Sequence, residues 1–194
     1  MAGGFSKILR TLARAKGAVL RQYRIKTDPV GYARSLGVRV GEGSRFYGMR
    51  AGMFSTEPWL ISIGNNVHIT AECQFITHDG GTLIVRKEVP DLELTFPISI
   101  GDDVYIGIRT IILPGVTIGS RSIIAAGSVV SKDIPDNSVA AGVPARVIKT
   151  TDAYLEKAKL RSLHIGHLSK KDKEAALMAL YGVQPPALSE VEDE

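Results

Sequence analysis

The sequence predicts an all-β solenoid, in which short parallel strands wind into a narrow triangular coil. Large apolar residues recur at every sixth position in two series: Ile63, Ile69 and Phe75, and then Ile100, Ile106, Ile112, Ile118, Ile124 and Val130. Four residues after most of these stands a small or β-branched residue, as at Val67, Cys73 and Thr110. A period of six is too short for a helical repeat but suits one face of a coil in which three repeats make one turn.

The composition supports the same fold. The chain has 20 glycines among 194 residues, while only 6% of its residues are aromatic. Glycine suits the bends of a coil, and a slim interior has little room for large rings. We expect the large aliphatic side chains to stack inward and Gly, Asn or Asp to occupy the bends. Cys73 is expected to fill the core rather than to act as a reactive thiol.

Length and charge limit the class of protein. A chain of 194 residues with 44% hydrophobic and 23% charged residues is typical of one globular domain with short appendages. No window is long and apolar enough to span a bilayer, and the N-terminus lacks the pattern of a secretory signal. The single cysteine excludes an internal disulfide. We therefore expect a cytoplasmic protein.

Residues 1–27 are predicted to form a basic amphipathic helical segment. Residues 1–26 contain seven Lys and Arg and no acidic residue, and Phe5, Ile8, Leu9 and Leu12 recur at helical spacing. Such a helix can lie on an anionic membrane surface, which would place the protein at the inner face of the membrane. Alternatively, Leu9 and Leu12 dock on the domain or on a neighbouring subunit. Nucleic-acid binding is not expected, because the sequence contains no recognisable reader module or aromatic platform.

The coil is predicted over residues 38–149, with one interruption. Over residues 79–97 the period fails, and glycines, Pro90 and the mixed charges of residues 86–88 indicate a protruding loop of the kind that is usually functional. Helical spacing over residues 152–163, and again from an N-cap at Ser169 to Tyr181, predicts a C-terminal helical cap over 150–183 that covers the open end of the coil. Residues 184–194 form an acidic tail.

Four motifs give the sequence a family resemblance. They are Ile100-Gly-Asp-Asp-Val-Tyr-Ile-Gly107, Ile112-Leu-Pro-Gly-Val-Thr-Ile-Gly119, Ala126-Gly-Ser-Val-Val-Ser-Lys-Asp-Ile-Pro135 and Ala141-Gly-Val-Pro-Ala-Arg-Val-Ile148. The sequence resembles the hexapeptide-repeat acyltransferases, whose fold is a left-handed parallel β-helix. Within them it is similar to the branch of galactoside, maltose, xenobiotic and polysaccharide O-acetyltransferases. The resemblance implies a homotrimer with active sites between subunits, and acetyl-CoA as co-substrate with no metal required for catalysis.

The resemblance also points to one histidine as the catalytic residue. Family members carry it where the coil breaks into the loop, and His78 stands at that place here. An imidazole suits the role of general base, because the acceptor hydroxyl must lose its proton as it attacks the thioester. Direct transfer needs no acyl-enzyme. A backbone N–H near Gly107 and Ile108 resembles the family's donor to the oxyanion.

The donor contacts, carried over by position, lie in the later coils. They are Tyr105, Gly107, Ile108, Ala126, Ser131, Lys132, Arg146 and Lys149. Small residues let backbone amides approach the extended arm of CoA, and the cations can meet its phosphates. Two positions depart from the galactoside branch, because Tyr105 stands where Trp is common and Ile108 replaces a small polar residue. Lys132 and Lys149 are alternatively solvated charges.

The acceptor side is assigned to Glu57 and Asp79. Glu57 precedes the first regular coil and can bind the acceptor, orient His78, or serve only in a turn. Asp79 can assist His78 or only start the loop. His68, ten residues before His78, fits an outward coil position with a surface role.

These features together predict transfer of an acetyl group to a sugar hydroxyl in capsule, lipopolysaccharide or exopolysaccharide biosynthesis. Alternatives within the same chemistry are N-acetylation of a nucleotide-linked amino sugar and acetylation of a small xenobiotic alcohol. A zinc enzyme of the carbonic anhydrase kind would need three histidines on neighbouring faces, and the coil supplies only His68 and His78. A non-catalytic β-helix scaffold is the remaining alternative, against which the retained His78 and the run 126–148 argue.

Overall fold

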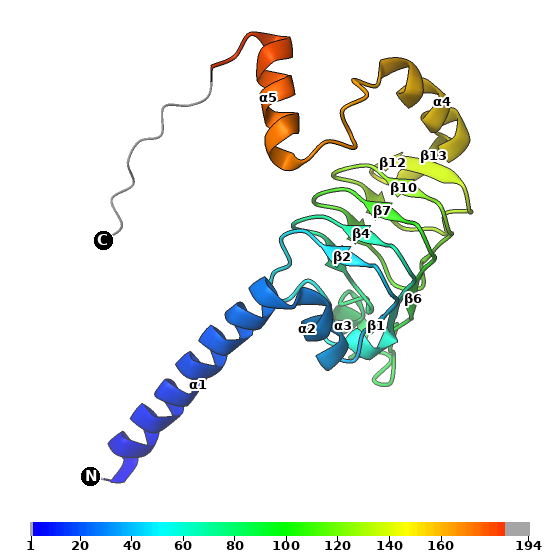
Figure 1. The fold of residues 1–194 in the computed structure, drawn as a ribbon. Coiled ribbons are helices and arrows are strands. Elements are labelled where there is room, and N and C mark those ends of the chain that lie inside the picture. The colour runs from blue at the N-terminus through cyan, green and yellow to red at the C-terminus, as the bar shows by residue number, and fades with distance from the viewer. Residues whose placement is uncertain (1, 185–194) are drawn as a thin grey trace. The chain divides into compact units, whose positions relative to one another are not determined.

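The computed structural model describes residues 2–184, with side chains described from Arg14 onward, and its centre is a coil of short parallel strands with three faces (Figure 1). The first face contains β1 (Arg39–Val40), β3 (Ile61–Ile63), β6 (Ile98–Ile100) and β9 (Thr117–Ile118). The second contains β2 (Arg45–Phe46), β4 (His68–Ile69), β7 (Tyr105–Ile106), β10 (Ile123–Ile124), β12 (Ser138–Gly142) and β13 (Ala145–Thr150). The third contains β5 (Gln74–Phe75), β8 (Ile111–Ile112) and β11 (Val129–Val130). We call them the first, second and third faces.

The strand register confirms the period of six. Ile100 pairs with Ile118 on the first face and Ile106 with Ile124 on the second, so one turn of the coil takes 18 residues. Ile63 pairs with Ile100, 37 positions later. The excess over one turn equals the length of the loop 79–97, and the loop is therefore a simple insertion between two turns whose strands remain in register.

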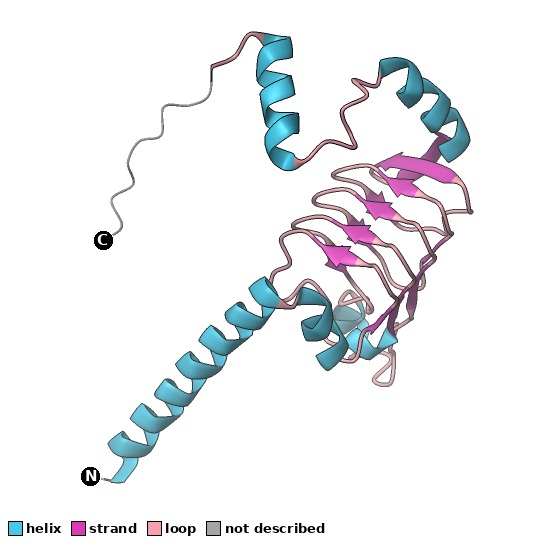
Figure 2. Cartoon of the chain, in the orientation of Figure 1, coloured by secondary structure: helices cyan, strands magenta, loops and turns pink. Residues whose placement is uncertain are grey.

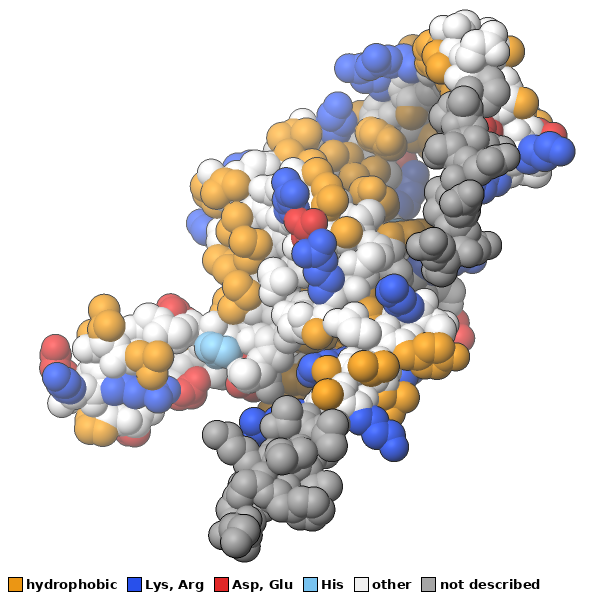
Figure 3. Space-filling view, turned by 90° about the vertical axis from the view of Figure 1, so that its left-hand side faces the viewer, with side chains coloured by type: hydrophobic (Ala, Val, Ile, Leu, Met, Phe, Trp, Pro, Cys, Tyr) orange, Lys and Arg blue, Asp and Glu red, His pale blue; other side chains and the backbone are white. Residues whose placement is uncertain are grey.

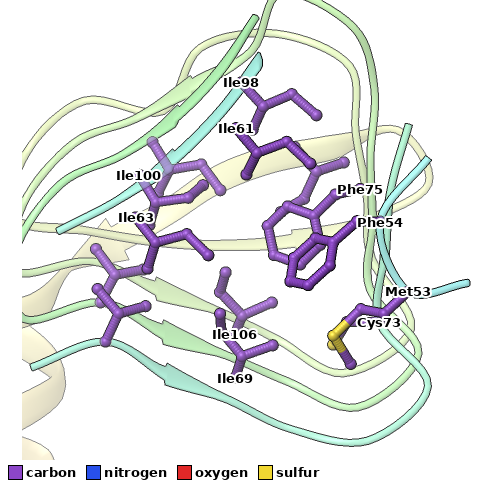
Figure 4. Close-up of a cluster of buried hydrophobic side chains, with 14 of the residues drawn as sticks. Met53, Phe54, Ile61, Ile63, Ile69, Cys73, Phe75, Ile98, Ile100 and Ile106 are labelled. Atoms are coloured by element: carbon purple, nitrogen blue, oxygen red, sulfur yellow. The ribbon is translucent and has the colours of Figure 1, made fainter. Parts of the chain in front are cut away.

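The interior is a set of stacked columns of equivalent side chains. Figure 4 shows Ile61 beside Ile98, Ile63 beside Ile100, and Ile69 beside Ile106, with Phe54 next to Phe75. Ile61, Ile69, Ile98 and Ile106 are fully buried, and the centroids of the two Phe rings lie 5.4 Å apart. Burying each such side chain stabilises the fold by roughly 1.5–3 kcal/mol. The columns therefore supply the main driving force for folding.

The small-residue positions do more than fill space. Thr110 Oγ1 donates to the carbonyl of Gly107 at 2.7 Å, and Ser128 Oγ donates to that of Ala125 at 2.7 Å. Cys73 Sγ donates to the carbonyl of Gly107 at 3.3 Å. Cys73 is buried, as expected for a core filler, and this burial raises the pKa of its thiol. These side chains satisfy buried carbonyl groups where the chain turns.

The residues at the bends differ in part from expectation. Asn66 and Asp103 adopt positive φ as predicted, but so do Glu72, Arg109 and Arg121, with φ of 61°, 61° and 56°. Stacked bends contact one another: Asn66 Nδ2 donates to Asp103 Oδ1 at 2.6 Å, and Arg109 Nε to Glu72 Oε2 at 2.8 Å. The prediction of Gly, Asn or Asp at every bend was wrong. Residues with long side chains disfavour the left-handed backbone conformation, but contacts between turns help to hold them in it.

The ends of the coil also differ from the simple repeat. The coil was predicted to continue to residue 149, but β12 and β13 pair antiparallel, so the chain turns back as a hairpin over residues 138–150. At the other end, α1 (Ala2–Thr27) occupies the predicted helical segment. It is followed by α2 (Pro29–Ser35), which the sequence analysis missed. Asp28 caps α2 by accepting a hydrogen bond from the N–H of Gly31 at 2.8 Å.

The chain divides into two compact units, residues 1–154 and 155–194. The division falls within α4 (Thr151–Arg161). The next helix, α5 (Lys170–Tyr181), follows its predicted N-cap, Ser169, and is followed by Gly182, whose φ is 63° (Figure 2). Among the described residues, neither helix buries a side chain, and the cap over the coil stays a prediction. Of the predicted acidic tail, residues 185–194 lie outside the described range. Within that range, every helix is too short or too polar to cross a bilayer.

Candidate active site

The loop 79–97 leaves and rejoins the coil through a pair of short segments, residues 77–79 and 94–96, which we call the neck. Directly after β5, the carbonyl of Thr77 accepts a hydrogen bond from the N–H of Phe96 at 2.8 Å, and the backbone N–H of Asp79 donates to the carbonyl of Leu94 at 2.9 Å. His78 lies between these bonds and forms an antiparallel bridge with Thr95. The backbone of His78 is thus fixed by pairing on a two-stranded neck, which holds the imidazole at the point where the loop begins.

The loop has internal structure of its own. It contains a short helix, α3 (Thr82–Val85), which the sequence analysis did not anticipate. Asp79 Oδ1 accepts a hydrogen bond from the N–H of Gly81 at 2.8 Å, and Arg86 pairs with Glu93 at 2.6 Å. Asp79 therefore acts as a turn residue in this conformation, which is one of its two predicted roles.

A carboxylate contacts the imidazole. His78 Nδ1 lies 2.9 Å from Glu57 Oε2, which also accepts a hydrogen bond from Thr77 Oγ1 at 2.7 Å. Thr56 Oγ1 donates to the other carboxylate oxygen at 2.5 Å. The hydrogen bonds from Thr56, Thr77 and His78 lower the pKa of Glu57 from 4.5 to about 2. Glu57 is therefore ionised at neutral pH and holds its place among three donors.

This contact decides which ring nitrogen carries the proton. An ionised carboxylate only accepts hydrogen bonds, so the proton of a neutral His78 lies on Nδ1 and the lone pair on Nε2. The hydroxyls of Ser55 and Thr56 lie further from Nδ1, at 3.2 and 3.3 Å. The side chain of His78 is 35% exposed, so it is accessible to a second molecule. The pair is arranged as a general base with an orienting carboxylate.

A polar pocket of about 210 Å³ adjoins the pair. Its walls come from the segment before β3, the neck and the loop, and include Thr56, Glu57, His78, Asp79, Arg86 and Glu93. The loop residues Arg86 and Glu93 were not singled out as site residues from the sequence. A larger hollow of about 500 Å³ lies on α5, and none of the predicted site residues lines it.

The predicted donor residues fall into groups. Tyr105, on β7, points outward from the second face and is 44% exposed. Ile108 follows it at the bend between the second and third faces, where its carbonyl accepts a hydrogen bond from the N–H of Gly127 at 2.7 Å. Ala126 stands at the same bend one turn later and is exposed. These three residues thus lie on the second face or at the bend that follows it.

Gly107 is explained by packing. It is buried, and its N–H donates to the carbonyl of Ile124 at 2.8 Å. A Cβ on Gly107 would lie 2.5 Å from the backbone nitrogen of Ala126. Only glycine lets adjacent turns approach this closely, and the Gly107 N–H is already used inside the coil.

The remaining donor residues lie elsewhere. Ser131 and Lys132 follow β11 at the far end of the third face, just as His78 follows β5. Arg146 and Lys149 belong to β13 on the second face. Within one subunit, Ile108 therefore precedes the third face while His78 follows it, so that the bend and the histidine lie at opposite ends of that face.

His68 is separate from the His78 site. It stacks on Tyr47 with ring centroids 5.8 Å apart, and its Nδ1 lies 2.9 Å from the Tyr47 hydroxyl. Its Nε2 lies 3.2 Å from Asn66 Oδ1. His68 thus has the surface role predicted for it. Among the side chains described, no three His, Cys, Asp or Glu residues come together as a metal site.

Comparison with known proteins identifies the family. The family profile "Bacterial transferase hexapeptide (six repeats)" matches residues 97–132. Protein CapG of Staphylococcus aureus is 46% identical over 145 residues, which are 75% of this chain and 84% of that protein. The chain belongs to the hexapeptide-repeat transferase family.

Other relatives extend this result. The galactoside O-acetyltransferase of Escherichia coli (strain K12) is 41% identical over 122 residues, 59% of this chain and 56% of that enzyme. Among solved structures, a hexapeptide-repeat acetyltransferase of Vibrio cholerae, complexed with acetyl coenzyme A, is similar with a TM-score of 0.51 and 29% identity. The match covers 69% of this chain and 84% of that one. Family and structural similarity together imply the left-handed sense of the coil.

Proposed function

We propose that this member of the hexapeptide-repeat transferases is an O-acetyltransferase that moves an acetyl group from acetyl-CoA to a sugar hydroxyl during capsule, lipopolysaccharide or exopolysaccharide assembly. The observation that carries the proposal is the Glu57–His78 pair beside a polar pocket, at 2.9 Å. A relative named for O-acetylation of galactosides and a structural neighbour complexed with acetyl coenzyme A support it.

The proposed chemistry is direct transfer. Acetyl-CoA supplies a thioester carbonyl. His78 Nε2 takes the proton of the acceptor hydroxyl while that oxygen attacks the carbonyl carbon, and it returns the proton to the CoA sulfur when the carbon–sulfur bond breaks. Glu57 fixes the ring through Nδ1 and balances the positive charge that the imidazolium carries between these steps. Glu57 is therefore a positioning residue.

The donor is proposed to bind along the outer surface of the later turns. Because the N–H of Gly107 is bonded to Ile124, the N–H of Ile108 is the better candidate to meet the oxyanion. The small, exposed Ala126 leaves room for an extended pantetheine arm beside the bend. Within residues 14–184, no ion pair engages Lys132, Arg146 or Lys149, which suits them to CoA phosphates.

A homotrimer is proposed because the two halves of the site lie apart in one subunit. Ile108 and His78 stand at opposite ends of the third face, so a neighbouring subunit would bring a donor-binding bend to each histidine. The chain also exposes large apolar side chains, including Ile84, Val143 and Val147. Figure 3 shows hydrophobic patches between basic side chains on the face it presents. Light scattering of the purified protein should give three times the mass of the chain.

A mixing experiment tests the shared site. His78→Ala subunits and subunits carrying Ala126→Trp at the bend should each be inactive alone. When they are co-expressed, mixed trimers should regain part of the activity, because some sites then combine an intact His78 with an intact bend. No recovery in trimers shown to be mixed would place both halves of the site in the same subunit.

The decisive assay measures release of free CoA with a panel of sugars, nucleotide-linked amino sugars and small alcohols. We expect turnover with a sugar hydroxyl, loss of turnover in His78→Ala, and wild-type rates in the matched control His68→Ala. Faster turnover with amino sugars would instead favour N-acetylation. If isothermal titration detected no acetyl-CoA binding, the protein would be a scaffold.

A further inference from the structure

The helix α1 gathers most of its charges on one side and most of its apolar residues on the other. Projected onto an ideal helix, five basic residues fall within about 100° of the circumference. They are Lys7, Arg10, Arg14, Arg21 and Arg24. The other side, an arc of about 140°, holds the apolar residues. They are Phe5, Ile8, Leu9, Leu12, Ala15, Val19, Leu20 and Tyr23, which we call the apolar stripe.

The described part of α1 shows which side the protein itself covers. Ile25 is buried at 5% exposure, and the guanidinium of Arg24 lies 5.9 Å from the ring centre of Tyr32 in α2. Both residues project away from the apolar stripe on the helical wheel. Val19 and Tyr23, on the stripe, are 70% and 62% exposed. The chain thus anchors α1 through its last turns and leaves this part of the stripe uncovered.

We propose that α1 lies in the interface of an anionic lipid bilayer, with the apolar stripe among the acyl chains and the basic side toward the headgroups. Residues 1–26 carry seven Lys and Arg and no Asp or Glu, so the helix complements a negatively charged surface along its whole length. Lys16 and Lys26 fall within the arc of the stripe, where their long side chains can extend back to the headgroups.

The same charges argue against another copy of the chain as the occupant. Helices that associate through an apolar stripe are usually held in register by acidic and basic residues that flank it. Here the flanks offer no acid, so three copies of α1 side by side would bring together only like charges. A lipid surface relieves this repulsion and covers the stripe at the same time.

Vesicle flotation with the full-length protein tests the proposal. The probes are vesicles of phosphatidylcholine alone and of phosphatidylcholine mixed with phosphatidylserine. One variant removes charge (Arg10→Gln, Arg14→Gln, Arg21→Gln), and a second removes the exposed apolar residues (Val19→Gln, Leu20→Gln, Tyr23→Gln). A matched control removes the same charge from α5 (Lys170→Gln, Lys171→Gln, Lys173→Gln).

Wild type and the α5 control should float with anionic vesicles at low salt but not with neutral ones. Loss of three cations from α1 should weaken binding on the order of one hundredfold. Added salt should weaken wild-type binding, because it screens the charges. The apolar variant should also bind more weakly.

Three results would overturn the proposal: no binding to anionic vesicles, equal binding by the α1 charge variant and wild type, or a loss of binding in the α5 control as large as in the α1 variant. A fall in oligomer mass on changing the stripe, without vesicle binding, would identify a second copy as the occupant. The proposal does not depend on the acetyl transfer reaction, whose CoA release is measured without lipid.

Discussion

The two bends that flank the third face are built from the same repeat but have different roles. At the bend before it, each turn repeats the last: the hydroxyls of Thr110 and Ser128 bond to carbonyls at 2.7 Å, and Gly107 packs against the next turn. At the bend after it, one turn departs from the pattern, and there His78 meets Glu57. Repetition supplies stability and, at the first bend, the proposed surface for the donor, while the single departure from it places the imidazole and carboxylate of the proposed base.

The largest expected effect, and the strongest test of this difference between the bends, comes from changing His78. We expect His78→Ala to lower kcat by about 10²- to 10⁴-fold, because the proposed general base is lost. Acetyl-CoA affinity and the thermal midpoint should stay close to wild type, since the imidazole is partly exposed and lies outside the stacked columns. A variant that unfolded instead of losing turnover would show that the two bends do not divide their tasks.

A substitution in the stacked columns should have the converse effect and lower stability rather than turnover. Ile106 is fully buried beside Ile69 and Ile124, and Ile106→Ala should lower the free energy of unfolding by about 2–5 kcal/mol. The folded fraction should keep its CoA-release rate per molecule. Denaturant unfolding provides the measurement, and the matched control is Ile84→Ala, at a side chain 83% exposed in the loop, which should change stability little.

Glu57 is expected to affect both catalysis and stability. Glu57→Gln keeps the shape but cannot balance an imidazolium, and we expect kcat to fall on the order of tenfold with little change in KM. A rise in KM with kcat unchanged would instead make Glu57 an acceptor-binding residue.

The pH dependence of stability gives a second measurement on Glu57. Its pKa is about 2 in the folded protein against an ordinary 4.5, so ionisation of Glu57 favours folding above pH 4.5, and this contribution disappears as the pH falls toward 2. Glu57→Gln lacks the contribution. The stability difference between wild type and variant should therefore be constant near neutral pH and shrink in acid. Unfolding curves between pH 2 and 7 would record it, and a difference that did not shrink would contradict the assignment.

The smallest expected effect concerns the hydroxyls inside the coil. Thr110→Val removes the donor to the Gly107 carbonyl, and we expect a loss of about 1 kcal/mol in unfolding free energy. Thr110→Ser, which keeps the hydroxyl, should recover most of it. If Val matched wild type and Ser did not, the hydroxyl would act only by its size.

The fold was largely predictable because its period is written in the residues themselves. The steps of six from Ile100 to Val130 correspond to strands and buried columns. The bends at Glu72 and Arg109 were not predictable, because their left-handed conformation is helped by a contact between residues 37 positions apart. The hairpin of β12 and β13 was also missed, since its residues keep the apolar character of the repeats before them.

The site was predictable only at its centre. His78 stood out because the period stops there, and Glu57 was noted without a way to choose among three roles. Its contact depends on an irregular segment that brings residues 21 positions apart within 2.9 Å, which no spacing rule encodes. Arg86 and Glu93 reach the pocket only because the loop folds on itself around α3.

The neck of the loop has a consequence for how such proteins diversify. Two backbone hydrogen bonds, at 2.8 and 2.9 Å, close the loop, and the turns on either side pair as if it were absent. The length and residues of a segment attached in this way can change while the strands of the coil keep their register. Under the proposed function, changes in this segment, about one tenth of the chain (residues 79–97 of 194), would alter the pocket beside His78 while the strands of the coil keep their register.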